Sequence, residues 1–90
     1  MNIPALAVEF LGTFIFLYVI VATGNPWAIG ATLAVLAYLG GEISGGHFNP
    51  AVTVMMLYKK SVNTTTAVAY IVAQVLAGLL AVIAYTKVKA

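Results

Sequence analysis

The sequence predicts an all-α fold, namely a transmembrane helical bundle of three membrane-spanning helices plus one re-entrant half helix. Three observations carry this prediction. The 90 residues are 63% hydrophobic and only 7% charged, whereas soluble domains carry about 25% charged residues. Three apolar stretches are long enough to be read as spans. A fourth apolar stretch is too short to span, and it follows a segment that cannot form a regular helix.

The first predicted span covers residues 3–22 and contains one charge, Glu9. About 20 helical residues extend roughly 30 Å, the thickness of a hydrocarbon core. Turn-forming residues 23–26 follow, and Trp27 is typical of an interfacial anchor. Because no basic segment precedes this long apolar stretch, we expect a retained transmembrane helix rather than a signal peptide.

The second and third spans are predicted at residues 28–43 and 67–85. The second is short for a span, and Lys87 and Lys89 close the third. Each contains a row of small residues spaced three or four apart, which in lipid favours close helix packing. The rows are Gly30, Ala34, Ala37 and Gly41 in the second span, and Ala69, Ala73, Ala77 and Ala81 in the third.

Residues 44–58 are predicted to form the re-entrant loop and half helix. Gly45 and Gly46 loosen the backbone, and the residue before Pro50 is pushed out of the α region. Asn49 suits the N-cap and Pro50 the first helical position. A helix from Asn49 to Tyr58 is about 15 Å long, half a bilayer. Non-helical backbone at that depth persists only when buried in protein or lining a water-filled cavity, which favours a pore.

Residues 44–53 read SGGHFNPAVT. This string resembles the first signature of the major intrinsic protein family, the aquaporins and aquaglyceroporins. Residues 7–13 resemble the start of the family's first helix, and residues 69–74 resemble its third. The resemblance implies that residues 1–90 form a single aquaporin-like half unit, the N-terminal half with one Asn-Pro-Ala motif. It also implies an integral, multi-pass membrane protein that passes water or small neutral solutes such as glycerol, with no cofactor.

The N-terminus of the half helix is the predicted functional centre. It carries about half a positive charge and unpaired N–H donors, which at mid-membrane repel cations. The resemblance implies that Asn49 aims its amide donors into the pore, although a plain N-cap role is compatible with this. It also implies that the carbonyl groups of the loop line the path as acceptors. The implied pore-lining and selectivity set is Gly45, Gly46, His47, Phe48, Asn49, Pro50, Ala51, Val52 and Ile29.

Two polar residues within spans are predicted to support the loop. A carboxylate such as Glu9 is costly in a membrane and usually faces the bundle interior. The resemblance suggests that Glu9 accepts from loop N–H groups or from His47, and that Gln74 supplies similar bonds; the alternative is an interfacial glutamate. One histidine, no cysteine and two distant carboxylates argue against a metal site.

The chain also departs from the family pattern. It has one half helix where the family has two, and it has no arginine to form the narrow filter. Ile29 and Val52 would stand at filter positions, so we expect a wider, less polar filter that discriminates water from glycerol weakly. Three spans and one half helix cannot enclose a pore, so a second half unit is expected.

Two completions stay open at this point: an inverted homodimer, or a missing C-terminal half. The lysines are balanced, with Lys59 and Lys60 at one side and Lys87 and Lys89 at the other, so orientation bias is weak and dual topology is allowed. The alternative function is a non-conducting fragment or membrane assembly partner. An enzyme is disfavoured because no nucleophile–base pair is visible. Nucleic-acid binding is disfavoured because the net charge is only +2.

Overall fold

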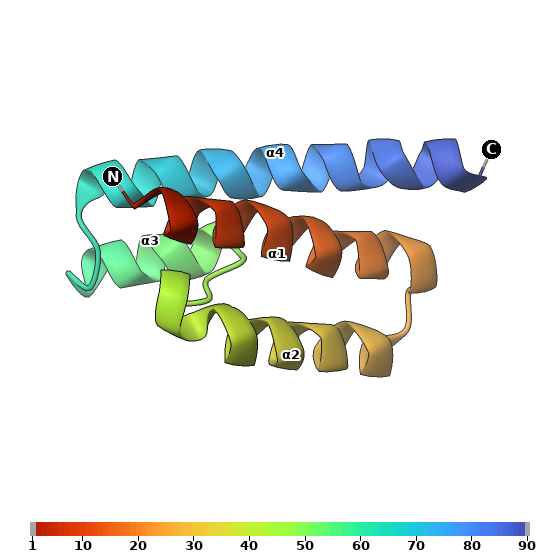
Figure 1. Ribbon diagram of the computed structural model, residues 1–90, viewed down its shortest axis with the longest axis horizontal. Helices are drawn as coiled ribbons and strands as arrows, with labels where there is room; N and C mark the ends of the chain where they lie inside the picture. Colours follow the sequence, from red (N-terminus) through yellow and green to blue (C-terminus); the bar gives the residue numbers. More distant parts are fainter. Residues whose placement is uncertain (1, 90) are drawn as a thin grey trace.

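The computed structural model describes residues 2–89 and contains, within them, four helices and no strand. These are α1 (Ile3–Thr23), α2 (Pro26–Ser44), α3 (Pro50–Tyr58) and α4 (Thr64–Lys89) (Figure 1). The three longer helices, α1, α2 and α4, are long and apolar enough to cross a membrane. The all-α prediction of three spans and one half helix is therefore confirmed.

Asparagine residues set where the helices begin, and they lengthen two spans beyond the predicted bounds. Asn25 Oδ1 accepts from the backbone N–H groups of Trp27 and Ala28, so α2 starts at Pro26 rather than at residue 28. Asn63 Oδ1 accepts from Thr66 N–H at 2.8 Å, and α4 starts at Thr64 rather than at residue 67. Hydropathy alone misses these turns because capping is a polar, local interaction.

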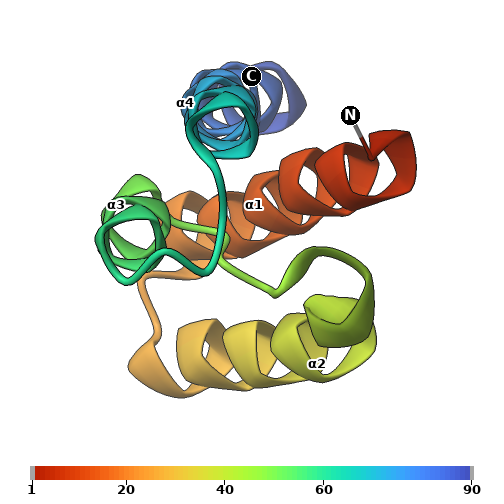
Figure 2. The same ribbon diagram turned by 90° about the vertical axis from the view of Figure 1, so that its left-hand side faces the viewer.

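Helix α1 is the centre of the bundle. Helices α4 and α2 pack on two sides of it, and α3 packs on α4 (Figure 2). No packing contact joins α2 to α3 in the described residues, so the bundle is open on the side between them. Helix α3 has 9 residues, whereas the other three helices have 19 to 26, and it occupies only one end of the molecule (Figure 1).

The two rows of small residues differ in burial. On α4, Ala73, Ala77 and Ala81 are buried, as the spacing predicts for a close helix contact. On α2 most of the row is exposed, and nothing lies within 4 Å of a Cβ added at Gly30. The expectation of packing along the whole α2 row is therefore wrong within this chain, because α2 approaches α1 with a different face, at Gly40.

Candidate functional site

Residues 45–49 connect α2 to α3 through a loop in which three residues have positive φ. Gly45 and Gly46 have φ of 92° and 66°, which glycine adopts without steric cost. Phe48 also has positive φ, at 52°, a conformation that costs a residue with a Cβ about 1–2 kcal/mol. Its ring is 1% exposed. Close packing of the buried ring against its neighbours opposes this strain.

The Phe48 ring fits between two glycines of the packed spans. A Cβ on Gly12 of α1 would lie 2.8 Å from Phe48 Cδ1, and a Cβ on Gly40 of α2 would lie 3.3 Å from Cζ. Gly12 is nine residues after Ile3 and eleven before Thr23, so the ring sits near the middle of α1. The half helix α3 therefore starts at mid-span.

The carboxylate of Glu9 holds the loop through four hydrogen bonds. Oε1 accepts from Phe48 N–H at 2.8 Å and from Gln74 Nε2 at 3.0 Å. Oε2 accepts from His47 N–H at 2.9 Å and from Ser44 Oγ at 2.7 Å. Glu9 is fully buried, which excludes the interfacial interpretation of this residue. Two of the four partners, His47 and Phe48, use backbone N–H groups that can only donate, and one of these groups lies on each carboxylate oxygen.

A second layer of hydrogen bonds ties the loop to α3 and α4. Gln74 Nε2 also donates to Thr53 Oγ1 at 2.9 Å, and Thr53 Oγ1 is 2.9 Å from His47 Nδ1. The Tyr70 hydroxyl donates to the Ser44 carbonyl oxygen at 2.7 Å. Residues from all four helices thus converge on the loop, and charge-assisted bonds to Glu9 are the strongest of them.

The loop turns its two polar edges in opposite directions. The N–H groups of Gly46, His47 and Phe48 donate inward, to Ser44 Oγ and to the two oxygens of Glu9. No hydrogen bond within residues 2–89 ends on the carbonyl oxygens of residues 45–48. These carbonyl groups remain available as acceptors for a molecule outside the bundle.

Asn49 ends this run as the N-cap of α3. Its Oδ1 accepts from Ala51 N–H at 2.8 Å, and the side chain is exposed. Since the oxygen is engaged, the amide NH₂ is the part free to donate outward. The α3 N-terminus adds its own positive end at the same place.

The structure brings most of the predicted site residues together, but not Ile29. Residues 45–52 form one continuous segment, in which the side chains of His47 and Phe48 point inward and only their backbone is available for lining. Ile29 is eleven residues before Gly40 on α2, about 16 Å along the helix axis from the level of Phe48. It stands at a different level of any path that passes Asn49.

Sequence reasoning missed Ser44, Thr53 and Tyr70, all of which are buried and hydrogen-bonded around the loop. The available signal was a polar group inside an apolar stretch, which in lipid needs a partner. Within residues 2–89 no cluster of three or more His, Cys, Asp or Glu could hold a metal ion.

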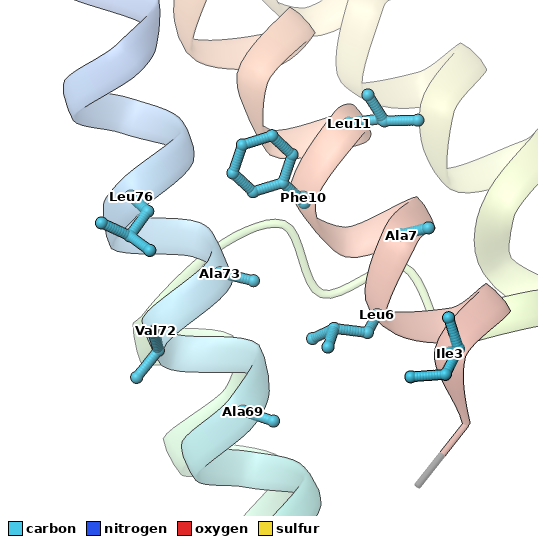
Figure 3. A pocket seen from close by; sticks show the side chains of 9 residues that line it. All are labelled: Ile3, Leu6, Ala7, Phe10, Leu11, Ala69, Val72, Ala73 and Leu76. Carbon is cyan, nitrogen blue, oxygen red and sulfur yellow. The ribbon is translucent and has the colours of Figure 1, made fainter.

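The largest groove lies away from this loop. It opens between α1 and α4, has a volume of about 740 Å³, and is lined entirely by apolar side chains (Figure 3). The lining residues are Ile3, Leu6, Ala7, Phe10, Leu11, Ala69, Val72, Ala73 and Leu76. With no polar group to orient a ligand, it is not the functional site.

Comparisons with known proteins agree on one family. A profile of the family described as "Major intrinsic protein" matches residues 23–89. "Glycerol uptake facilitator protein-like 6" of Lactiplantibacillus plantarum is 43% identical over 81% of this chain and 38% of its own length. "Probable aquaporin PIP2-6" of Oryza sativa is 40% identical over 87% of this chain and 34% of its length. The chain thus spans little more than a third of such relatives. No solved structure matches it significantly.

Proposed function

Because the chain belongs to the major intrinsic protein family, we propose that it forms half of a passive channel for water or small neutral solutes. Members of this family are channels rather than enzymes, and the chain is an integral, multi-pass membrane protein. The observation that carries the proposal is the start of α3 at mid-span, beside a loop whose carbonyl groups are unpaired in the described residues. Helix packing alone does not need an unwound segment at that depth.

In this proposal the loop offers a permeating molecule acceptors followed by donors. The carbonyl groups of Gly45, Gly46, His47 and Phe48 accept, and the Asn49 amide donates to the molecule's oxygen. Pro50, Ala51 and Val52 form the wall beyond it. Glu9 and Gln74 stay behind the wall, because their hydrogen bonds keep the loop N–H groups turned inward. The positive end of α3 disfavours cations at the same point.

The pore requires a second half unit on the open side between α2 and α3. Residues 1–90 would be one such unit, and the partner is either an inverted second copy or a C-terminal half. The two ends of the bundle each carry two lysines, Lys59 with Lys60 and Lys87 with Lys89. Weak orientation bias of this kind is compatible with an inverted homodimer.

Selectivity in this proposal depends on Ile29 and Val52. Both side chains are aliphatic and half-buried. Without an arginine in the chain, an aliphatic filter is wide and offers no charged donor. We therefore expect glycerol to pass as well as water. Water flux without glycerol flux would contradict this part of the proposal.

The experiment measures the osmotic shrinkage of proteoliposomes that contain only this chain. Stopped-flow light scattering records the rate of shrinkage. The test variant is Asn49→Asp, which keeps the N-cap oxygen but replaces the amide donor with a negative charge. The matched control is Asn63→Asp at the N-cap of α4, where Asn63 makes the same kind of cap bond. We expect fast flux in the wild type and in the control, and loss of flux in Asn49→Asp.

A second candidate function is that of a non-conducting assembly partner. The exposed apolar surface of α2 favours it, because only 11% of this span is buried within the chain. Flux no faster than empty vesicles, with insertion verified by protease protection, would favour that function or a missing second half. Equal flux in wild type and Asn49→Asp would contradict the assignment of Asn49 to the pore.

A further inference from the structure

The apolar groove between α1 and α4 contains none of the residues assigned to the channel path, and its length matches one leaflet of a membrane (Figure 3). Along α1 it runs from Ile3 to Leu11, which is about 12 Å at the helical rise. Half of a hydrocarbon core is about 15 Å thick. Because Ile3 is the first residue of α1, the groove begins at the membrane surface and ends near the middle of the bilayer.

Packed side chains close the groove at its deep end. A Cβ added at Gly78 of α4 would lie 2.9 Å from Leu17 Cδ1, so α1 and α4 are in close contact just beyond the groove. Further along, the rings of Tyr18 and Tyr85 meet edge-on with centroids 6.0 Å apart. The groove is therefore open to one leaflet and closed toward the other.

Inside a bilayer the groove needs an apolar occupant. Water does not fill it, because a buried water requires about two to four polar partners and the lining has only apolar side chains. An empty groove would forfeit the dispersion contacts of the side chains that line it. The material within reach is either a lipid acyl chain or the side chains of another helix.

The surface beyond the groove favours an acyl chain over a spanning helix. A helix packed along this face of α4 would also contact Leu80 and Ile83, which follow Leu76 at helical spacing and are exposed. Helix contacts in lipid use rows of small residues, and these side chains are bulky. Within the groove, by contrast, the methyl groups of Ala69 and Ala73 point toward α1 and leave room (Figure 3).

A polar pocket adjoins the surface end of the groove. It has a volume of about 220 Å³, shares two lining residues with the groove, and is also lined by Asn2 and Thr66. Asn2 Oδ1 caps the first turn of α1, so the NH₂ group is the part left to donate. The segment between α3 and α4, at the same end of the bundle, adds the exposed amines of Lys59 and Lys60, against one exposed carboxylate, Glu42 (Figure 1). This end therefore suits a phosphate group at the membrane surface.

We propose that the groove binds one acyl chain of a phospholipid from the leaflet at the start of α1, with the phosphate group held at the surface by Asn2 and the polar pocket. The chain carbonyl end lies beside Ile3 and the methyl end beside Phe10. This lipid site is separate from the channel path and does not depend on conduction.

The first test is photo-crosslinking of the wild-type chain in bilayers of a phospholipid that carries a diazirine on one acyl chain. With the diazirine near the methyl end, we expect the cross-links to concentrate at Phe10 and Leu76, the deep end of the groove. With the diazirine near the carbonyl end, they should move to Ile3 and Ala69. Labelling spread evenly over the exposed apolar residues of α1, α2 and α4 at each depth would overturn the proposal, because it would indicate only the surrounding bulk lipid.

The second test counts retained phospholipid by native mass spectrometry. We expect each copy of the wild-type chain to keep one phospholipid after the detergent is removed. Ala7→Phe should abolish this retention, because Ala7 lines the groove and is exposed, so that the ring fills the groove without entering the core. Ala22→Phe is the matched control and should keep the lipid, since Ala22 is exposed on the same helix but lies outside the groove.

The outcomes separate the possible occupants. A wild-type chain without retained phospholipid, or equal retention in Ala7→Phe and Ala22→Phe, would contradict the lipid site. A wild-type dimer that only Ala7→Phe dissociates would assign the groove to a second copy instead. Asn2→Asp keeps the cap oxygen but removes the amide donor, and unchanged retention in that variant would exclude Asn2 from the phosphate contact. If Ala7→Phe does not insert into the membrane, the cross-linking pattern of the wild type decides alone.

Discussion

Glu9→Gln isolates the hydrogen-bonding role of Glu9, because the two side chains have nearly the same size. Glu9 Oε1 accepts from Phe48 N–H and the Gln74 amide, and Oε2 accepts from His47 N–H and the Ser44 hydroxyl. A glutamine must place an NH₂ group at one of these two positions. At either position the NH₂ group of the glutamine faces hydrogen-bond donors, whereas the wild-type side chain has an acceptor oxygen there.

The structure allows the magnitude to be worked out. With the NH₂ at the Oε2 position, Ser44 can accept and turn its own proton toward the Gly40 carbonyl oxygen, 3.4 Å away. His47 N–H has no such choice, so one buried donor is left unpaired at a cost of about 1–3 kcal/mol. The opposite placement leaves two donors unpaired, Phe48 N–H and the Gln74 amide, and costs about twice as much.

Removing the charge has two further effects that oppose each other. The remaining bonds lose their charge-assisted strength, but the desolvation cost of a buried carboxylate disappears as well. We therefore expect Glu9→Gln to lower the free energy of unfolding by about 1–3 kcal/mol. The His47 amide should be the first in the loop to lose protection from hydrogen exchange.

The assay is unfolding followed by circular dichroism in detergent, together with hydrogen exchange of the loop amides in bilayers. Glu42→Gln is the matched control. Glu42 is exposed near the end of α2, and its substitution removes the same charge without disturbing a buried hydrogen bond. The reasoning would be refuted if the Glu9→Gln variant were as stable as the Glu42→Gln variant and if the amides of His47 and Phe48 kept their protection from hydrogen exchange.

Three other predictions follow from the same geometry. Gly12→Ala should destabilise the fold by about 1–3 kcal/mol, because the added Cβ would overlap the buried Phe48 ring. Its control is Gly30→Ala, which should be neutral or stabilising because the added Cβ meets nothing within 4 Å. Equal melting temperatures of the two variants would be inconsistent with this prediction. Tyr70→Phe should cost about 0.5–1.5 kcal/mol through loss of the bond to the Ser44 carbonyl, whereas Tyr58→Phe at a 91% exposed site should not change the melt. Mercurials should leave water flux unchanged because the chain has no cysteine, and Val52→Cys should become sensitive; an insensitive Val52→Cys would remove Val52 from the pore wall.

The sequence by itself determined the number of spans, the unwound segment and the start of the half helix. Each of these depends on neighbouring residues. Apolar runs of sufficient length predict spans, paired glycines interrupt a helix, and Asn49 followed by Pro50 begins one. The Asn49 cap bond to Ala51 spans only two residues. Because such interactions are local, they could be predicted without knowledge of the bundle.

Only the tertiary structure decided how the loop is held. The hydrogen bonds of Glu9 reach residues 35 to 65 positions away in sequence, and no local pattern shows that its partners are the loop N–H groups rather than the His47 ring. The inward turn of the Phe48 ring likewise depends on two glycines from different helices. The exposed Gly30 row of α2 is the opposite case. Small residues permit close packing, but the face that a helix buries is set by the helices around it.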